Sequence, residues 1–438
     1  MKVYAFVPAK SSSERVENKN KRVLDGNMLY ERAIKTLLNC REIDKVFLDT
    51  DSEEMYQAID YLPIIFMKRD KNLASNATDG HQMFMNEVNS YPDADIYVQL
   101  LCTSPFIKSE TIDSAIKILK ESNEYDSAVM MKKDKFYFWE NNKPSYDMNH
   151  IPNSKDLPET LIESMGLYIV KKETALKTNK RIGNNPYLIF GSLEELIDVN
   201  TPDDLEYAQT YAKGLKHKET SKFRQIKHFM TSALLSDILD DFEIKYNKKC
   251  GGLINGFSCN LSNAKMLGRA STIKLRKIRE NEDFSLVYEA LNHYKYLGEN
   301  DIIVVENECS EFAYFGELNA RLAIRAGAQG AVINGVTRDK AQTEILNFPV
   351  FSKGYNSQDV RRRAVLDYIN KPVDFNGLKI HPHDLIFIDS EGMGVIYSEY
   401  EKEILETIFN NYINEKNIVE DILMDKKTKD ILSERGAF

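Results

Sequence analysis

Two pairs of residues that could do chemistry bracket the segment GELNARLAIRAGAQGAVINGVTRD, residues 316–339. Gly316-Glu317 opens this segment, Arg338-Asp339 closes it, and twenty residues separate Glu317 from Arg338. The interior predicts a helix, a glycine stop and a short strand that returns the chain to its starting edge. Carboxylates beside an arginine suit a hydrated Mg²⁺ or Mn²⁺, and the guanidinium suits bidentate binding of a keto acid. The alternative is that these are ordinary helix-cap and loop charges.

A second candidate site is the loop PAKSSSERVENKN, residues 8–20, which follows the first apolar run. Its three serines let the backbone approach a ligand closely, and their hydroxyls can donate hydrogen bonds. Lys10, Arg15 and Lys19 add three positive charges. Backbone N–H groups and cations after a strand suit a polyphosphate. A solvated basic loop is the alternative, because the loop contains no glycine and no Walker-type pattern.

The elements that must position this loop are predicted by apolar runs that alternate with amphipathic stretches. Such alternation predicts an α/β fold with an open, largely parallel sheet covered by helices. Ligands of such sheets bind beyond the carboxyl ends of the strands. Thr201-Pro202 then begins a capped helix that closes the pattern. Strands are expected at 2–8, 45–51, 64–70, 95–102, 126–133 and 165–172, and helices at 28–40, 79–91 and 109–122.

A polar, charged stretch without apolar periodicity, residues 214–225, is expected to be a linker between two domains, 1–213 and 226–438. The second domain is expected to begin with a helix and to contain a β-rich section before its C-terminal helices. The expected elements are a helix at 232–242, strands at 266–276, 301–307, 330–334 and 348–354, and the β-rich section at 371–398.

Length and composition exclude several classes of protein. A chain of 438 residues is long enough for two domains. The net charge of −9 argues against a nucleic-acid partner. Five scattered cysteines without a CxxC pair fit reduced thiols better than disulfides or zinc. The N-terminal apolar run is too short for a signal peptide, and no stretch reaches the roughly 18 apolar residues that span a bilayer. We therefore expect a cytoplasmic protein without a membrane partner.

Residues 1–213 resemble the sugar-acid cytidylyltransferases, the family that makes CMP-sialic acid and CMP-Kdo. The loop at 8–20 carries the opening motif, and LDTDSEE, RDKNLASNATDG, LLCTSPFI and IDVNTPDDL follow in order. The resemblance implies a nucleotidyltransferase-type, Rossmann-like open sheet. It also implies a reaction in which the anomeric hydroxyl of a sugar acid attacks the α-phosphate of CTP and pyrophosphate leaves. Arg15 and Lys19 would be catalytic, and the implied nucleotide contacts are Lys10, Ser11, Ser12, Ser13, Asn20, Arg69 and Ser104.

Three positions depart from this family's pattern. Asp198 matches a metal-binding aspartate, which implies Mg²⁺ or Mn²⁺, but Asn200 replaces the second acid of that site. Leu101-Cys102 replaces an expected Gln-Pro pair that contacts the nucleotide. Glu163 lies where sialate-type enzymes carry an arginine in the sugar region. We therefore expect Glu163 to contact a substrate other than sialic acid itself.

The C-terminal half resembles the RraA-like family, which includes class II pyruvate aldolases acting on 4-hydroxy-4-methyl-2-oxoglutarate. The signature at 316–339 carries the resemblance, together with LSDILDD, FPVFSKG and PVDFNGLKIHPHDLIFIDSEGMGVI. It implies an α/β domain with a β-rich core that assembles as a trimer or hexamer. By resemblance, Asp339 would bind the metal, Arg338 would hold the substrate carbonyl and stabilise the pyruvate enolate, and Glu317 would orient water. The backbone amides of Leu318 and Asn319 would take the keto-acid carboxylate.

Two features of the RraA-like family are altered or unassigned here. Gln342 stands where the family often has an acid. The glutamate that a neighbouring subunit supplies could be Glu401, Glu403 or Glu406. Family members that inhibit a ribonuclease usually lack the aspartate after the arginine, so Asp339 favours an enzyme.

The two resemblances together suggest a bifunctional enzyme of surface-glycan biosynthesis. Aldol addition of pyruvate gives a 2-keto-3-deoxy acid, and a cytidylyltransferase activates such an acid. The expected partners are therefore small molecules, namely CTP, a sugar acid and pyruvate or a related keto acid. One alternative makes the C-terminal half a non-catalytic oligomerisation or regulatory module. In another, the first half transfers CMP to a phosphonate or a sugar phosphate.

Overall fold

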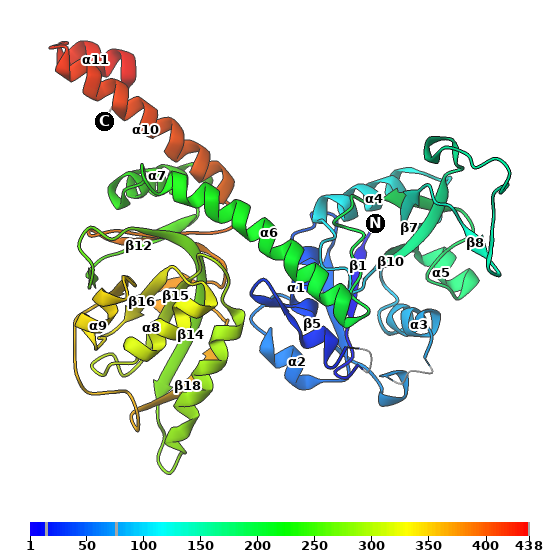
Figure 1. The fold of residues 1–438 in the computed structure, drawn as a ribbon, viewed down its shortest axis with the longest axis horizontal. Coiled ribbons are helices and arrows are strands. Elements are labelled where there is room, and N and C mark those ends of the chain that lie inside the picture. Colours follow the sequence, from blue (N-terminus) through cyan, green and yellow to red (C-terminus); the bar gives the residue numbers. More distant parts are fainter. Residues whose placement is uncertain (14–15, 75–77, 437–438) are drawn as a thin grey trace. The chain divides into compact units, whose positions relative to one another are not determined.

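The computed structural model describes residues 1–13, 16–74 and 78–436. The chain divides into two compact units, Met1–Thr210 and Tyr211–Phe438. Each unit has its own sheet with helices packed on it (Figure 1). The boundary between the units falls inside the helix α6 (Pro202–Ile226). Among the described residues, no helix combines the length and the apolar character needed to cross a bilayer.

The first unit is built on a seven-stranded sheet in the order β11-β7-β10-β6-β1-β4-β5. The strands β6, β1, β4 and β5 run parallel, and β10 is antiparallel to both of its neighbours. Every residue of β1 and β6 is buried, as expected for strands covered on both faces. The predicted α/β class and largely parallel sheet are thus confirmed. The strands are β1 (Val3–Pro8), β4 (Lys45–Thr50), β5 (Ile65–Lys68), β6 (Ile96–Leu100), β7 (Ser127–Asp134), β10 (Thr160–Lys171) and β11 (Pro186–Phe190).

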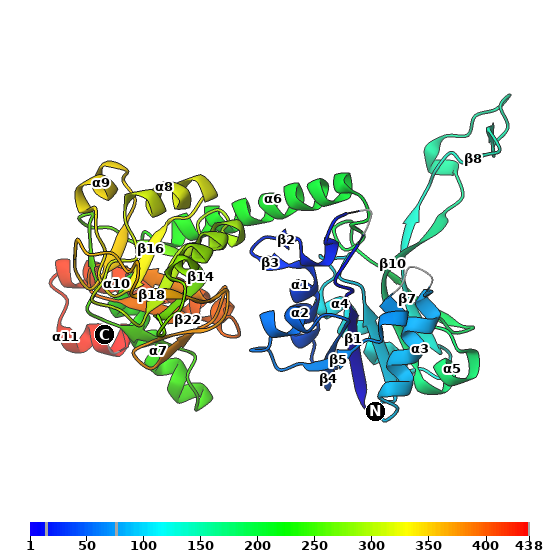
Figure 2. The ribbon, with the colours of Figure 1, turned by 90° about the horizontal axis from the view of Figure 1, so that it is seen from below.

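The helices of the first unit follow their strands, as the alternating pattern predicts. Asp79 caps α3, because its Oδ1 accepts hydrogen bonds from the backbone N–H groups of His81 and Gln82. A long excursion between β7 and β10 carries the ribbon β8 (Trp139–Glu140) and β9 (Lys143–Pro144), which extends away from this unit's sheet (Figure 2). The helices are α1 (Leu29–Leu38), α2 (Glu53–Ala58), α3 (Gly80–Ser90), α4 (Ser109–Glu121) and α5 (Lys172–Thr178), with short 3₁₀ turns η1 (Lys19–Lys21), η2 (Lys71–Ala74) and η3 (Ser154–Asp156).

The second unit is built on a nine-stranded mixed sheet in the order β12-β22-β21-β14-β15-β16-β17-β13, with β18 also pairing β14. The strands β14 to β17 are parallel, and the remaining pairs are antiparallel. The β-rich section expected at 371–398 is present. Strand bounds are β12 (Gly251–Ile254), β13 (Ser258–Cys259), β14 (Met266–Lys277), β15 (Ile302–Asn307), β16 (Gly330–Asn334), β17 (Val350–Ser352), β18 (Ala364–Ile369), β21 (Leu385–Ile388) and β22 (Met393–Ile396), with a separate hairpin β19 (Val373–Phe375) and β20 (Leu378–Ile380).

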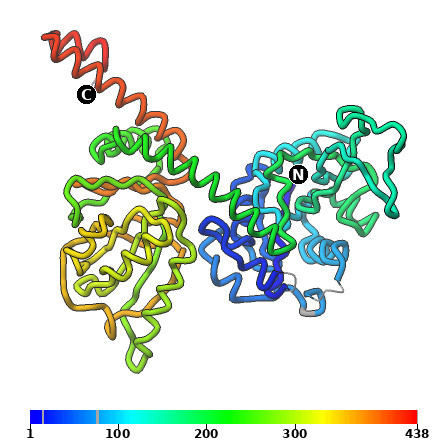
Figure 3. Tube along the Cα trace, viewed as in Figure 1, coloured from blue at the N-terminus to red at the C-terminus, as the bar shows by residue number. Residues whose placement is uncertain are grey.

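The helices of this unit cover both faces of its sheet and extend beyond it. One core cluster packs α8 on β15 and β16, and another packs α7 and α10 on β21 and β22. The trace in Figure 3 shows α10 running out past the sheet, with α11 folded back against it, and Arg435 Nε donates to Asp421 Oδ2 at 2.8 Å between the two helices. The helices are α7 (Ser232–Tyr246), η4 (Phe284–Tyr296), α8 (Glu317–Ala326), α9 (Lys340–Ile345), α10 (Glu401–Leu423) and α11 (Thr428–Arg435).

The stretch at 214–225, expected to be a polar linker without periodicity, is helical. It forms the second half of α6. Lys, Glu and Gln favour helices, and the buried residues Ala212, Lys216, Thr220 and Phe223 recur three or four positions apart on one face. Lys216 and Thr220 are polar, so this face is invisible to a search for apolar periodicity.

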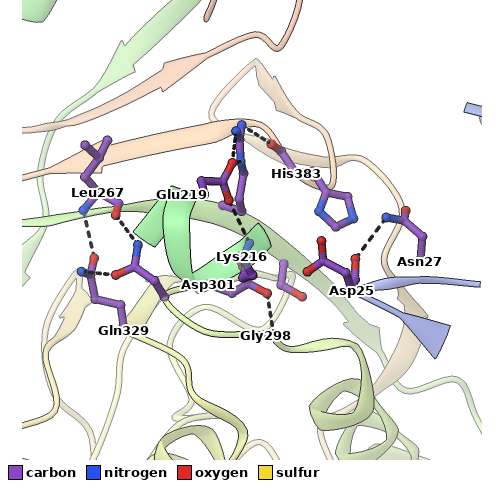
Figure 4. A network of polar contacts seen from close by, with 12 residues as sticks. Asp25, Asn27, Lys216, Glu219, Leu267, Gly298, Asp301, Gln329 and His383 are labelled. Carbon is purple, nitrogen blue, oxygen red and sulfur yellow. Dashed lines mark hydrogen bonds and ion pairs between the residues drawn. The ribbon is translucent and has the colours of Figure 1, made fainter. Parts of the chain in front are cut away.

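Ion pairs attach the second half of α6 to the rest of the second unit. Lys216 Nζ lies 2.8 Å from Asp301 Oδ1, and the backbone N–H of Gly298 donates to Asp301 Oδ2 at 2.7 Å (Figure 4). Glu219 accepts a hydrogen bond from Arg269 Nε at 3.0 Å. The Lys216–Asp301 pair is buried, so removing one partner would leave the other charge uncompensated.

Candidate functional site

A cavity of about 590 Å³ lies in the first unit, beyond the carboxyl ends of its parallel strands. Residues directly after β1, β5 and β6 reach it, as expected for an open α/β sheet. Its lining also includes residues that follow β11, so segments distant in sequence converge on it. The lining residues are Pro8, Lys10, Ser13, Val16, Lys19, Asn20, Arg69, Leu73, Ala74, Thr78, Met83, Leu101, Cys102, Thr103, Met165, Arg181, Asp198 and Asn200.

Lys19 is held at this cavity by the segment after β11. Its Nζ donates to the carbonyl oxygen of Val199 at 2.9 Å and to Asn200 Oδ1 at 3.3 Å. Asn200 Nδ2 in turn donates to Asp198 Oδ2. The 3₁₀ turn η1 that carries Lys19 is fixed by Ser13, whose Oγ accepts from the backbone N–H of Lys19 at 2.7 Å. These contacts place an ammonium group and a carboxylate close together on the cavity wall.

Arg69 contributes a guanidinium whose charge is already compensated. Its Nε and Nη2 bind the two carboxylate oxygens of Asp49 at 2.9 and 2.8 Å, and both side chains are buried. Glu87 lies beside this pair, and burial followed by the charge of Asp49 raises the pKa of Glu87 well above its ordinary value. Glu87 Oε2 also accepts a hydrogen bond from Gln99 Nε2 at 2.8 Å. The two hydrogen bonds to Asp49 fix the Arg69 guanidinium rigidly against the sheet.

Three of the predicted nucleotide contacts do not line the cavity. Both the backbone N–H and the hydroxyl of Ser11 donate to Asp51 at 2.7 Å. Burial alone would raise the pKa of Asp51, but the hydrogen bonds from Ser11 hold it below its ordinary value. Ser12 is exposed, and Ser104 is buried beneath Gly166. Arg15, predicted to be catalytic, lies outside the described residues.

Cys102 takes part in the cavity wall in place of the expected Gln-Pro pair. Its thiol donates to Asn20 Oδ1 at 3.1 Å, and Asn20 Nδ2 donates to the carbonyl oxygen of Lys10 at 2.8 Å. Burial raises the pKa of Cys102 to about 12, so the thiol is neutral at physiological pH. Cys102 therefore positions Asn20 and the loop rather than acting as a nucleophile.

The residues expected to bind a metal give a partial set of oxygen ligands. Among the described residues, no donor reaches Asp198 Oδ1, which is buried at the cavity wall. Nowhere in the described part of the chain do three His, Cys, Asp or Glu side chains gather as a metal cluster. Mg²⁺ commonly binds through one or two carboxylates, with phosphate oxygens and water completing the shell. Asp198 with Asn200 Oδ1 fits that mode and does not fit a fully protein-made cage.

Glu163, predicted to contact the substrate, does not line the cavity, but it is joined through Tyr168 to Arg181, which does. The hydroxyl of Tyr168 donates to Glu163 Oε1 at 2.5 Å and accepts from Arg181 Nη2 at 3.0 Å. The register of β10 against β7 shifts between Glu163 and Tyr168, and Met165 within that shift has a φ of 56°. Such an irregularity re-aims side chains, and Met165 within it lines the cavity.

In the second unit, the ends of the segment at 316–339 do meet. The helix α8 ends at Ala326 with Gly327 as its C-cap, and β16 returns the chain as predicted. Asp339 Oδ2 accepts from the backbone N–H of Glu317 at 3.0 Å, and a Cβ on Gly316 would lie 2.4 Å from that oxygen. Glycine is therefore required at 316, because the Asp339 carboxylate occupies the space of a side chain there.

Arg338 and Asp339 are held in position by contacts that the sequence did not reveal. Arg338 Nη2 lies 2.8 Å from Asp359 Oδ2, and its Nε lies 3.8 Å from Asp339 Oδ2. Asp339 has a φ of 56°, a left-handed conformation that a non-glycine residue rarely adopts. Such residues concentrate at functional sites, where the surrounding structure enforces them.

The first turn of α8 offers the backbone amides predicted to bind a carboxylate. As first-turn residues, Leu318 and Asn319 have backbone N–H groups without partners inside the helix. The Leu318 side chain is 76% exposed. The Asn319 side chain is engaged by the fold, since its Nδ2 donates to the carbonyl oxygen of Tyr314 at 2.8 Å. Glu317 Oε1 accepts from Arg321 Nε at 2.9 Å.

Of the three glutamates considered for completing this site, two have partners within the chain. Glu401 binds Arg269, and Glu403 binds Lys245 and Tyr246. Glu406 is exposed and forms no ion pair with any residue in the described ranges.

Comparison with known proteins agrees with the division of the chain into two units. The sequence model of the family described as Cytidylyltransferase matches residues 4–189, and that of the family described as Aldolase/RraA matches residues 233–395. This chain joins a cytidylyltransferase domain to an RraA-like domain.

Similar proteins align either with about half of this chain or with nearly all of it. The N-acylneuraminate cytidylyltransferase of Escherichia coli O18:K1:H7 is 22% identical over 444 residues, which cover 93% of this chain and 99% of that protein. The CMP-N,N'-diacetyllegionaminic acid synthase of Legionella pneumophila is 25% identical over 232 residues, 47% of this chain and 93% of that protein. An uncharacterised protein of Methanocaldococcus jannaschii is 30% identical over 187 residues, 41% of this chain and 84% of that protein.

Sequence reasoning missed several residues at the two sites. Arg181 lines the cavity of the cytidylyltransferase domain, and Asp49 anchors Arg69 there. Asp359 anchors Arg338 in the RraA-like domain. Arg181 and Asp359 lie outside every motif that the sequence analysis quoted, whereas Asp49 lies within LDTDSEE, where no role was assigned to it.

Proposed function

We propose that the cytidylyltransferase domain transfers CMP from CTP to a 2-keto-3-deoxy sugar acid. The observation that carries this proposal is the convergence of Lys10, Ser13, Lys19, Asn20 and Arg69 on one cavity beyond the parallel strands. A triphosphate needs several cationic and N–H donors at the carboxyl edge of such a sheet. The resemblance to sugar-acid cytidylyltransferases supplies the acceptor class.

The proposed reaction forms one phosphoester bond and breaks one phosphoanhydride bond. The anomeric hydroxyl oxygen of the acid attacks the α-phosphorus of CTP and loses its proton, and pyrophosphate leaves. Lys19, fixed by Val199 and Asn200, stabilises the charge that develops on the phosphate oxygens. Asp198 and Asn200 would hold Mg²⁺ or Mn²⁺, which offsets the charge of the triphosphate when bound.

A screen of acceptors tests this proposal. Pyrophosphate release from CTP should depend on a 2-keto-3-deoxy acid in the assay. The panel should also contain a sugar phosphate and a phosphonate, the alternative acceptors. If pyrophosphate is released with the sugar phosphate or the phosphonate but with none of the keto acids, the alternative acceptors replace the sugar acid.

The metal requirement is tested separately. Activity should disappear in excess EDTA and return with Mg²⁺ or Mn²⁺, because among the described residues Asp198 Oδ1 has no hydrogen-bond donor and a bound cation would satisfy it. Asn200→Asp restores the acid that the family usually carries, so it should keep activity. Transfer that persists in EDTA would refute the metal role of Asp198.

For the RraA-like domain we propose a metal-dependent pyruvate aldolase or lyase activity. Asp339 would bind the metal, Glu317 would orient water, and Arg338 would neutralise the enolate of pyruvate. The backbone amides of Leu318 and Asn319 would bind the keto-acid carboxylate at the start of α8. We further propose that the active form is a trimer or a multiple of it, with Glu406 reaching a neighbouring subunit's site. A non-catalytic oligomerisation or regulatory domain is the competing proposal.

Pyruvate release from oxaloacetate or a 4-hydroxy-2-oxoacid with Mg²⁺ decides between these proposals. Arg338→Lys keeps the charge but loses the planar fork that binds Asp359 and the substrate, so activity should fall severely. Asp339→Asn should lower metal affinity and activity together. Arg325→Lys, at the exposed far end of α8, is the matched control and should behave as wild type. A wild type that releases no pyruvate across the panel would favour the non-catalytic domain.

A further inference from the structure

Arg181, which lies in no motif of the sequence analysis, lines the cavity of the cytidylyltransferase domain. Arg181 follows α5 and is half-buried. Its guanidinium carbon lies 3.9 Å from the centroid of the Tyr168 ring, and its Nη2 donates to the Tyr168 hydroxyl at 3.0 Å. The stacking and the hydrogen bond together fix the plane of the guanidinium.

The opposite side of this guanidinium is closed by a glycine. A Cβ on Gly80, the first residue of α3, would lie 2.6 Å from both Cζ and Nη1 of Arg181. The backbone N–H of Arg181 also donates to His81 Nδ1 at 3.2 Å. The absence of a side chain at position 80 therefore makes the room in which Arg181 lies.

The charge of Arg181 has no direct ion-pair partner among the described residues, and the nearby Asp79 carboxylate acts on it at longer range. Unlike Arg69, it forms no ion pair with a carboxylate in the described part of the chain. The neighbouring Asp79 carboxylate is engaged with the backbone N–H groups of His81 and Gln82. Glu163 is reached only through the Tyr168 hydroxyl. An oriented guanidinium at a cavity suits a bidentate oxyanion ligand.

We propose that Arg181 binds the carboxylate of the acceptor acid. This inference rests on the proposed cytidyl transfer and identifies the residue that selects an acid as its acceptor. Lys10 and Lys19, on the loop after β1, serve the triphosphate in that scheme, whereas Arg181 lines the cavity together with Met165 of β10. Glu163 orients Tyr168 and, through it, Arg181.

The test compares the free keto acid with its methyl ester, which lacks the negative charge. The wild type should prefer the free acid in kcat/KM. Arg181→Gln should raise the KM for the acid about tenfold to a hundredfold, the loss expected for a charged hydrogen-bonded contact, with the KM for CTP changed by less than about threefold. It should also lose most of the preference for acid over ester. Arg181→Lys should be intermediate, because it keeps the charge and loses the fork.

Two further variants separate binding from folding. Gly80→Ala leaves Arg181 in the chain but displaces its guanidinium, so it should also raise the KM for the acid and reduce the preference over the ester. Arg41→Gln removes an exposed arginine of the same domain that does not line the cavity, and it should match the wild type.

Each outcome of this comparison decides the inference. An active wild type with an Arg181→Gln variant that keeps the full preference for the acid would overturn the inference alone. A raised KM for CTP with an unchanged KM for the acid would assign Arg181 to the triphosphate and also overturn it. A wild type that transfers CMP to no acid would overturn the proposed function, and the inference would fall with it.

Discussion

At the scale of single residues, Lys19 is the side chain on which the proposed transfer depends most directly. Lys19→Ala should lower CTP turnover by about one to three orders of magnitude, as the loss of a charge contact in the transition state does. Lys21→Ala is the matched control, because Lys21 lies in the same 3₁₀ turn, pairs with Glu54 at 3.3 Å and does not line the cavity. Steady-state pyrophosphate release measures both variants. Equal turnover in Lys19→Ala and wild type would remove Lys19 from the mechanism.

A buried histidine of the RraA-like domain gives the protein a pH-dependent stability. His293 is fully buried against Ser271, whose Oγ lies 2.7 Å from His293 Nε2, and burial lowers the pKa of His293 to about 3 from 6.5. The unfolded chain therefore binds a proton that the folded domain excludes. The stabilisation is fully present above pH 6.5 and is lost as the pH falls below that value, by about 1 kcal/mol between pH 6.5 and 5.5.

Urea unfolding of the full chain at these two pH values measures this effect. His293→Gln does not titrate, so the difference in unfolding free energy between the two pH values should shrink by about 1 kcal/mol relative to wild type. His228→Gln, an exposed histidine of the same unit, should keep the wild-type difference. If the unfolding free energy of His293→Gln changed between the two pH values as much as that of the wild type, His293 would not be the source of the effect.

Sequence motifs predicted some site residues, and contacts between distant segments produced the others. Lys19 and Asn20 stand in one continuous motif, so their types and spacing are visible in the sequence. Asp359 and Arg181 become relevant only once the fold brings Asp359 to Arg338 and Arg181 to Tyr168. Ser11 shows the opposite case, because its type suits a phosphate contact but Asp51 binds it instead.

At the scale of elements, the buried strands and the start of α6 at Pro202 were predictable, but the second half of α6 was not. The parallel strands give continuous apolar runs because helices cover both faces of the sheet. The second half of α6 buries Lys216 and Thr220, so its periodicity is carried by polar residues. Its tertiary contacts, such as the ion pair of Lys216 with Asp301, cannot be predicted from the hydropathy of the sequence.

Two glycines test how α6 and the hairpin β19–β20 are built. A Cβ at Gly214 or at Gly377 meets nothing within 4 Å, but Gly377 has a φ of 89° in the turn of its hairpin. Gly214→Ala should stabilise α6 by about 0.5–1 kcal/mol, because alanine loses less backbone entropy in a helix. Gly377→Ala should destabilise its turn by about 1–2 kcal/mol, because L residues disfavour that conformation.

Amide hydrogen exchange measures both glycine changes in the intact protein. Exchange should slow in peptides from α6 for Gly214→Ala and accelerate around 373–380 for Gly377→Ala. Faster exchange of α6 in Gly214→Ala would mean that residue 214 is not inside a regular helix.

At the scale of the whole molecule, one chain carries two candidate sites in two separate units. Each site is described by residues of its own unit, the cavity within Met1–Thr210 and the Arg338-Asp339 site within Tyr211–Phe438. Lys19→Ala should therefore depress CTP turnover without changing pyruvate release, and Asp339→Asn should depress pyruvate release without changing CTP turnover. Parallel assays of both variants measure this. Loss of both activities in either variant would show that the two sites depend on each other.

The most direct test of the central claim is to follow the complete reaction by ³¹P NMR, with CTP, Mg²⁺ and a 2-keto-3-deoxy sugar acid as substrates. The proposed transfer predicts that pyrophosphate and a new CMP phosphodiester accumulate in equal amounts, and that neither forms without the acid. Release of orthophosphate, or pyrophosphate formation that does not depend on the acid and leaves only free CMP, would contradict it.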